Sequence, residues 1–448
     1  MQEAENLFSE GQFERALERF QQALTIYKRT NNQDGQGNIL LKLGATHEIL
    51  GQYEQSLEWY ELASNLFSSR QNLRGEGAAR SGMGLAYLRL GRYGQSLGAY
   101  QEALEIRKRA QDRSGEAISL SGIGVVYMRL GEYERALEYH QEALNIRRTL
   151  SGQRGEATSF HNIGMVYEAL GNYSRALQNY QQSFELYKKF DDLTGQERSL
   201  SSIAEILIQQ NRASEAMELL QNALNISQNI QDPLGEGIIL GKIGRAYEVV
   251  GDYESALQNH RRALQIAEQI NSPLIKSISL QEIASLLEEQ NQLELAIIFY
   301  KDFVNVVESV RQDIAALPEE VQSSFTATIE DTYRHLANLL LQEDRVLESQ
   351  QVLDLLKVQE LDNYLRGVRG DRTTAGGVDF WQAEQEILER FNSLQKSATE
   401  LSQELTRLRR IPETQRTPSQ QNQINELVSL EEALNRQFND FIQSDEII

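Results

Sequence analysis

The sequence predicts an all-α solenoid, built from stacked pairs of helices and followed by a C-terminal helical hairpin. Three observations favour this fold class. Residues 115–154 recur as near copies when the chain is shifted by forty residues in either direction. Within each copy, apolar residues recur at helical spacing. A glycine followed two residues later by an aromatic residue divides most copies in two. Such a period is the signature of repeat architectures, in which each unit buries its apolar face against its neighbours.

Each unit is predicted to hold two helices that meet at a glycine. In the central copy, apolar residues at helical spacing run from about Gly115 to Leu130 and again from Tyr133 to about Thr149. Gly131 between them fits the left-handed conformation that ends many helices, because glycine has no Cβ to clash. Asparagine tolerates this conformation better than most residues. A glycine or an asparagine occupies the position in the other copies, at Gly11, Gly51, Gly91, Gly171, Asn211, Gly251 and Asn291.

A set of residues at fixed places in the central copy points to a known repeat family: Leu120, Ile123, Gly124, Tyr127, Ala136, His140 and Ala143. This pattern resembles the tetratricopeptide repeat (TPR), over roughly residues 1–310. The forty-residue period looks like the long-helix subclass of kinesin light chains and G-protein-modulator scaffolds. The resemblance implies a right-handed superhelix whose first helices line a concave groove for a peptide or protein.

The chain divides into four predicted segments, of which the first two are helical repeats. Residues 1–315 are predicted to form about eight helix pairs, and residues 2–10 are the stub of a truncated first pair. Residues 316–365 lose the register of the repeat. They are predicted to hold two helices, over about 319–342 and 345–365, that close the array as a divergent pair.

The third and fourth segments are a linker and a hairpin. Residues 366–379 are rich in glycine and lack periodic apolar residues, which predicts a linker. Residues 380–448 carry apolar residues at alternating steps of four and three, interrupted by a loop between Pro412 and Pro418. This spacing predicts an antiparallel helical hairpin that leads toward a further C-terminal module. Pairing of these helices between chains is the alternative interpretation.

Residues 317–370 and 410–442 carry a second resemblance. They are similar to the region that separates TPR arrays from CHAT domains in large bacterial, especially cyanobacterial, proteins. CHAT domains are caspase-like and use a His/Cys pair, which this cysteine-free chain cannot supply. The resemblance therefore implies that a CHAT module follows Ile448 in the parent protein. It implies that the present chain is the recognition or regulatory arm of that protein.

Composition excludes several classes of function. The chain has 65 acidic and 44 basic residues, for a net charge of −21. This balance disfavours nucleic acids and anionic membranes as partners, because both attract clustered positive charge. The absence of cysteine excludes disulfides, thiolate catalysis and Cys-ligated zinc. The first residues lack the pattern of a signal peptide, and no apolar run is long enough to span a membrane. A cytoplasmic protein is expected.

The sequence displays no candidate catalytic or metal-binding site. His140 and His260 occupy the repeat position held elsewhere by Tyr60 and Tyr100, so they are interpreted as packing residues. No histidine belongs to an HExxH motif or another ligand spacing on one helix face. We therefore expect no enzymatic activity, no metal and no cofactor.

The expected function is a protein–protein interaction scaffold that holds a peptide or protein partner in the concave groove. When the repeats are aligned on Gly124, three further residues are expected to face the groove: Gly82, Gly122 and Glu205. The small residues among them are expected to leave an open floor for the partner. Asn162 matches an asparagine with which long-helix relatives clamp a peptide backbone. The alternative is a structural spacer that self-associates weakly through its C-terminal helices. The predicted partner-binding residues are Ser81, Leu85, Arg89, Ser121, Val125, Arg129, His161, Asn162, Met165, Ser202, Lys242 and Arg245.

Overall fold

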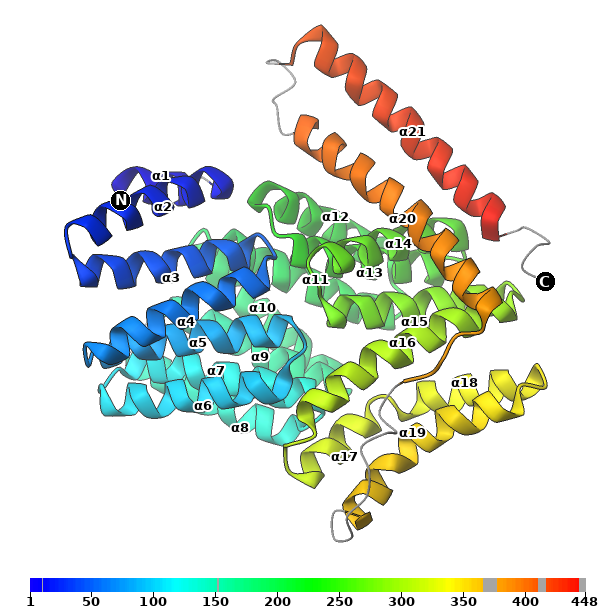
Figure 1. The fold of residues 1–448 in the computed structure, drawn as a ribbon, viewed down its shortest axis with the longest axis horizontal. Coiled ribbons are helices and arrows are strands. Elements are labelled where there is room, and N and C mark those ends of the chain that lie inside the picture. Colours follow the sequence, from blue (N-terminus) through cyan, green and yellow to red (C-terminus); the bar gives the residue numbers. More distant parts are fainter. Residues whose placement is uncertain (10, 151–152, 366–376, 410–415, 443–448) are drawn as a thin grey trace.

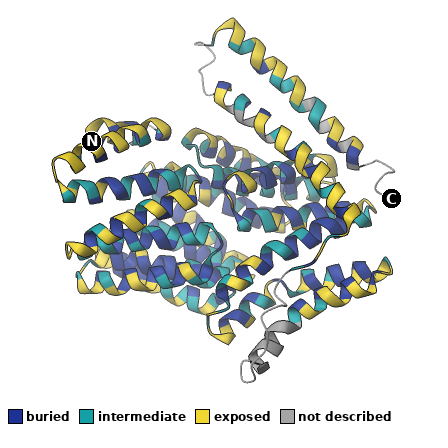
Figure 2. Cartoon of the chain, in the orientation of Figure 1, coloured by how far each residue is buried: buried dark blue, intermediate teal, exposed yellow. Residues whose placement is uncertain are grey.

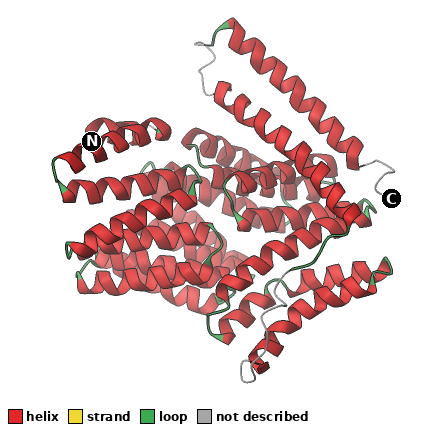
Figure 3. Ribbon diagram, viewed as in Figure 1, coloured by secondary structure: helices red, strands yellow, loops and turns green. Residues whose placement is uncertain are grey.

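The computed structural model describes residues 1–9, 11–150, 153–365, 377–409 and 416–442. Over these ranges every regular element is a helix and none is a strand (Figure 3). The all-α solenoid with a C-terminal hairpin is therefore confirmed. In the same ranges, no helix combines the length and the apolar character needed to cross a membrane.

The helices form consecutive pairs along the chain (Figure 1). A short helix, α1 (Gln2–Ser9), precedes α2 (Phe13–Arg29), as expected of a truncated first pair. The pairs that follow are α3 (Gln33–Ile49) and α4 (Tyr53–Ser69), α5 (Leu73–Arg89) and α6 (Tyr93–Arg109), α7 (Arg113–Arg129) and α8 (Tyr133–Thr149), α9 (Gln153–Ala169) and α10 (Tyr173–Lys189), α11 (Leu193–Gln209) and α12 (Ala213–Ile230), α13 (Pro233–Val249) and α14 (Tyr253–Gln269), and α15 (Pro273–Glu289) and α16 (Leu293–Ile314).

Each pair turns at the repeated glycine or asparagine. Gly51, Gly91 and Gly131 have φ angles of 72°, 70° and 79°. Asn211 and Asn291, which replace the glycine, have φ angles of 58° and 61°. The prediction that this position is left-handed is therefore confirmed, and the two asparagines keep the geometry at a modest steric cost.

Tyrosine rings lock successive pairs together. The ring of Tyr100 on α6 lies between Gly84 of α5 and Gly122 of α7, where an added Cβ would stand 2.8 Å and 2.3 Å from ring carbons. Tyr60 covers Gly82 in the same way, at 2.5 Å. These glycines are therefore needed so that the helices can approach the rings. The open floor expected at Gly82 and Gly122 is wrong, because aromatic rings fill that space.

The array also contacts itself across one superhelical turn, along a surface that we call the seam. At the seam, the turns of the pairs α3–α4, α5–α6 and α7–α8 meet helices from the C-terminal half of the array. A Cβ on Gly51 would touch Ile270, and one on Gly91 would lie 3.1 Å from Pro273. Figure 1 shows α16 running beside the early repeats.

Further seam contacts involve α16 and the short helix α17 (Glu319–Ala327). The ring of Tyr93 meets that of Phe325 edge-on at 6.3 Å. Arg135 Nη2 lies 2.9 Å from a carboxylate oxygen of Glu320. The seam therefore combines apolar contacts with an ion pair and fixes the early repeats against the end of the array.

The divergent pair after the array has one more helix than expected. The single helix predicted over about 319–342 is divided into α17 and α18 (Glu330–Gln342), before α19 (Val346–Leu365). At the break, the hydroxyls of Thr326 and Thr328 donate to the carbonyls of Gln322 and Phe325. The backbone amides of Thr328 and Ile329 bond to the carbonyls of Phe325 and Thr326, three residues earlier, and Ile329 has a φ of −119°, so the chain leaves the α-helical path there.

The C-terminal hairpin consists of α20 (Gln382–Arg409) and α21 (Pro418–Ile442), which pack on each other. Its base docks on the array: the Phe391 ring lies 4.9 Å from that of Phe299 on α16 and 5.4 Å from that of Phe438 on α21. The apolar stripe read as a possible contact between chains is thus buried within this chain at Phe391 and Phe438. Most of the predicted linker, residues 366–376, lies outside the described residues.

A buried ionic network also holds the start of α20. Lys301 of α16 is fully buried, and its Nζ lies 2.8 Å from Glu384 of α20 and also contacts Glu348 of α19. Arg345 pairs with both carboxylates and stacks over Trp381, with its guanidinium 4.1 Å from the ring centroid. Two cations and two carboxylates thus compensate one another in the interior, as burial of charge requires.

Candidate functional site

The first helices of successive pairs form a continuous row. We call α3, α5, α7, α9, α11, α13 and α15 the inner row, because each packs against the next member of the set. Figure 2 shows buried and half-buried residues along these helices. Close approach of every second helix is expected on the inside of a curved stack. The inner row is therefore the surface on which the predicted partner-binding residues lie.

None of the twelve predicted residues is exposed, and they fall into two groups. Ser81, Ser121, His161, Asn162 and Ser202 are buried, with exposed fractions of 6–8%. They lie where neighbouring helices pack; Ser81, for example, is 3.2 Å from the hydroxyl of Ser119 on α7. The half-buried residues, which retain contact with solvent, are Leu85, Arg89, Val125, Arg129, Met165, Lys242 and Arg245.

Most of the half-buried charges on the inner row are paired. Arg245 Nη1 lies 2.6 Å from Glu205 on α11, and Arg245 Nε lies 3.8 Å from Glu282 on α15. Lys242 donates to the carbonyl of Ser201 at 3.1 Å. Burial acts to raise the pKa of Glu205, but Lys242 and Arg245 outweigh it and hold that pKa below its ordinary value. This end of the row is thus a compensated ionic network.

Arg89 and Arg129, on adjacent helices, differ in how their charge is compensated, because Arg89 forms an ion pair with Glu48. Arg89 Nε lies 3.7 Å from Glu48, beyond hydrogen-bonding distance, and has no hydrogen-bond partner among the described residues. Within the same residues, the Arg129 guanidinium forms no ion pair with a carboxylate. Burial lowers the pKa of Arg129, and the neighbouring Arg89 lowers it further, while Tyr93 and Tyr133 act in the opposite direction. Burial also acts to lower the pKa of Arg89, but Glu48, Tyr53 and Asp232 together outweigh it, so that this pKa is raised.

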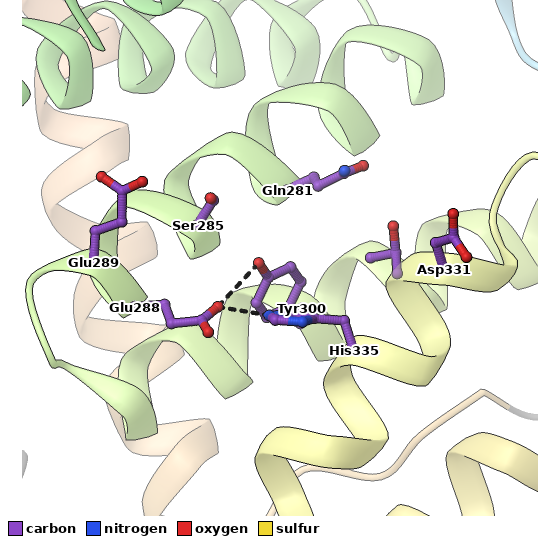
Figure 4. A pocket seen from close by; sticks show the side chains of 8 residues that line it. Gln281, Ser285, Glu288, Glu289, Tyr300, Asp331 and His335 are labelled. Atoms are coloured by element: carbon purple, nitrogen blue, oxygen red, sulfur yellow. Dashed lines mark hydrogen bonds and ion pairs between the residues drawn. The ribbon is translucent and has the colours of Figure 1, made fainter. Parts of the chain in front are cut away.

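A pocket of about 580 Å³ lies at the C-terminal end of the inner row (Figure 4). Here α18 packs against α16, and the pocket lies between α15 and α18. Glu288 Oε2 lies 2.6 Å from His335 Nε2 and accepts a hydrogen bond from the Tyr300 hydroxyl at 3.5 Å. The lining residues are Gln281, Ser285, Glu288, Glu289, Tyr300, Asp331, Thr332 and His335.

The pocket is built on repeat positions that the sequence already singled out. Gln281, Ser285 and Glu289 on α15 stand at the places of Ser121, Val125 and Arg129 on α7, 160 residues earlier. The lining contains no lysine or arginine but has carboxylates at Glu288, Glu289 and Asp331. Three of the eight lining side chains are therefore carboxylates, which accept hydrogen bonds, and the other five can both donate and accept.

Sequence reasoning missed the pocket, although one signal was available. A glutamate twelve residues before an aromatic residue or histidine recurs in several pairs and forms a contact each time. The Tyr180 hydroxyl donates to Glu168 at 2.5 Å, and His260 Nε2 lies 2.6 Å from Glu248. Glu288 and Tyr300 repeat this relation. His335, by contrast, comes from α18, which lies outside the forty-residue period, so no periodic pattern could place it there.

In the described part of the chain, no group of three or more histidine, aspartate or glutamate side chains is arranged to hold a metal ion. The residues of the inner row and its pocket are suited to hydrogen bonding and ion pairing with a partner.

Comparison with known proteins identifies the repeat. The family model described as "Tetratricopeptide repeat" matches residues 1–69, 35–109, 75–149, 115–189, 195–269 and 236–309. No curated protein matches the chain.

Solved structures show the same fold. A Rap protein complexed with competence and sporulation factor aligns with a TM-score of 0.53 and 13% identity, covering 70% of this chain and 98% of that one. The Rap conjugation gene regulator of plasmid pLS20, in complex with the Phr* peptide, aligns with a TM-score of 0.54 and 17% identity, covering 65% and 79%. At these identities the likeness concerns the fold alone.

Proposed function

Since this chain belongs to the tetratricopeptide repeat family, we propose that it is a non-enzymatic interaction scaffold, which binds a peptide or an extended segment of a protein along the inner row. The observation that carries the proposal is the pocket at the end of that row. Gln281, Ser285 and Glu289 line it from the same repeat positions as the half-buried residues of α5 and α7. A partner lying along the inner row would therefore reach the pocket.

The lining of the pocket favours a partner that places a hydrogen-bond donor in it. Its carboxylates, hydroxyls and amide offer acceptors, and a side chain that carries N–H groups would satisfy them. Two of the solved structures with this fold contain competence and sporulation factor and the Phr* peptide, respectively. These bound ligands support peptide binding as the function of the present array.

The proposed mechanism is preorganisation. The seam and the tyrosine rings hold the inner row in one arrangement before the partner arrives, so binding orders few protein groups. The entropic cost then falls mainly on the partner.

Affinity selection from a pool of random linear peptides tests the proposal. Bound peptides are separated with the protein by gel filtration and sequenced by mass spectrometry. We expect the wild-type chain to retain a reproducible set of peptides and Ser285→Trp, which fills the pocket, to lose most of it. Ser309→Trp on the exposed face of α16 is the matched control and should retain the set. The proposal fails if the wild-type chain retains no peptides or if both variants retain the same ones.

We also propose that the scaffold is the recognition or regulatory arm of a larger CHAT-type protein. Only the resemblance of residues 317–370 and 410–442 supports this context, and parts of both segments lie outside the described residues. The reading frame that continues after Ile448 tests it: a caspase-like module with its His/Cys pair is expected, and an unrelated sequence or a stop codon contradicts the proposal.

A further inference from the structure

We propose that a small cavity between α14 and the C-terminal hairpin binds a small inorganic anion such as chloride, and that the bound anion helps to hold the hairpin on the array. The cavity is separate from the inner row and its pocket. The inference therefore goes beyond the proposed function and does not depend on it.

The cavity lies where α20 packs against α14 (Figure 1), and it has a volume of about 30 Å³. Its lining comes from α14, α20 and α21. A single water molecule needs about 10–15 Å³ of such space. The cavity therefore has room for a small ion but not for a segment of a peptide.

Two side chains of α14 bring unsatisfied N–H groups to this cavity. Arg261 and Gln265, one helical turn apart, are each 7% exposed, and both line the cavity. Arg261 Nε and Gln265 Nε2 have no hydrogen-bond partner among the described residues. Buried donors without an acceptor are costly, so an acceptor held in the cavity would stabilise both.

The Arg261 guanidinium also lacks a counter-charge. Within the described part of the chain it forms no ion pair, and Glu431, the one carboxylate in the lining, does not pair with it. The guanidinium carbon lies 3.0 Å from the centroid of the Phe438 ring, but a ring compensates a positive charge less fully than an anion does. Burial lowers the pKa of Arg261 to about 9, so the side chain remains charged at neutral pH. A water molecule could satisfy the N–H groups, whereas an anion would also compensate this charge.

The repeat register supplies a matched comparison. Earlier pairs have an exposed glutamine at the position of Arg261, for example Gln101 and Gln141. The next pair has Lys301 there, which is also buried and is paired with Glu384 of α20 and with a second carboxylate on α19. Two equivalent cations are thus covered by the same end of the chain, and only one of them has carboxylates beside it in the described residues. We expect the counter-charge of Arg261 to come from solution.

Other buried arginines are satisfied in different ways. Arg147 donates a hydrogen bond to the hydroxyl of Ser159. Burial lowers the pKa of Arg107, but Asp112 opposes the effect. Arg261 differs from both because it combines a missing counter-charge with a cavity and a second unpaired donor.

The line width of the chloride NMR signal, measured with the full chain, tests the inference. Exchange of chloride with a protein site broadens this signal. We expect a saturable broadening with the wild type, reversed by bromide through competition. Arg261→Gln, which introduces the residue found at this position in earlier repeats, should abolish the saturable part. Gln265→Leu, which removes one donor and keeps the charge, should weaken chloride binding about tenfold. Arg109→Gln, at an exposed position of α6, is the control and should bind chloride as the wild type does.

Hydrogen exchange then measures the effect on the hairpin. When chloride is replaced at equal ionic strength by gluconate, an anion too large for the cavity, protection of α20 and α21 should fall in the wild type. Gln265→Leu should need about tenfold more chloride to restore it. The inference is overturned if the broadening does not saturate, if all variants broaden the signal equally, or if protection is the same in both salts. A cavity that holds water alone would give these results, and none of them bears on peptide retention by the inner row.

Discussion

The backbone amide of Gly94, in the first turn of α6, donates a hydrogen bond of 2.6 Å to Oδ2 of Asp313, which stands 219 positions later in the chain. The residue that precedes α6, Arg92, makes no side-chain capping hydrogen bond. Asp313 therefore caps a helix to which it does not belong, and its carboxylate also complements the positive end of the helix dipole. One helix of the early repeats is thus completed by the end of the array.

Replacing Asp313 by alanine should lower the free energy of unfolding by about 1 kcal/mol, the usual cost of losing an N-cap. Urea unfolding followed by circular dichroism measures the change. The control is Asp34→Ala, which removes an exposed carboxylate 3.2 Å from Arg70 and should cost less than about 0.5 kcal/mol. Equal losses in the two variants would argue against the seam contact.

Gly122→Ala and Gly98→Ala should change stability in opposite directions. Alanine in a helix interior normally stabilises by up to about 1 kcal/mol relative to glycine. That gain is expected at Gly98, where an added Cβ meets nothing within 4 Å. At Gly122 the Cβ would fall 2.3 Å from the Tyr100 ring, so overpacking should cost roughly 1–3 kcal/mol. Thermal melting of both variants provides the comparison, and two variants of equal stability would disprove the interlocking of rings and glycines.

His140 should make the chain less stable in mild acid. Burial lowers the pKa of its imidazole to about 3, and Arg147 adds to the effect. In the unfolded chain the pKa is about 6.5, so below that pH the unfolded state binds a proton that the folded state refuses. Stability is therefore fully present above pH 6.5 and falls as the pH decreases toward 3.

His140→Phe, which introduces the residue found at the equivalent Phe20, should remove this dependence. Between pH 7 and pH 5 the wild type should lose about 2 kcal/mol more than the variant. Chemical unfolding at several pH values measures the difference. Parallel pH profiles for the two proteins would show that His140 is not held neutral by burial.

Lys301→Met should detach the start of α20 from the array. Removal of one partner from a buried ionic network typically costs about 3–5 kcal/mol, because the remaining charges lose their compensation. Hydrogen exchange should show loss of protection in α20, with the inner row unaffected. Lys276→Met, which removes a partly exposed pair with Asp302 on neighbouring helices, should leave α20 protected. Unchanged protection of α20 in Lys301→Met would mean that the aromatic contacts alone hold the hairpin.

The sequence predicted the features that repeat every forty residues. The position of Gly131 in each copy specified the turn, and the intervening apolar spacing specified the helices. Both depend on local backbone geometry and on contacts between adjacent units, which the period itself encodes. The split of residues 319–342 into α17 and α18 was missed, because this segment lies outside the forty-residue repeat and the break has no periodic signal.

The candidate site was less predictable. The repeat register placed Arg129 and Ser121 on the same helix face, but it could not tell that Ser121 is buried and Arg129 half-buried. Burial depends on which neighbouring side chains are large, as Tyr60 is beside Gly82. The Gly94–Asp313 bond and the contact of His335 with Glu288 join parts of the chain that no period relates.

The seam also restricts how many units the array can contain. In an open solenoid, duplication or deletion of one unit leaves the other interfaces unchanged, so copy number drifts easily during evolution. Here, loss of one unit between α9 and α12 would bring different residues opposite Gly94, and Asp313 would no longer reach the start of α6. Gain or loss of a whole unit should therefore be selected against in this array, because it would disrupt the contacts of the seam.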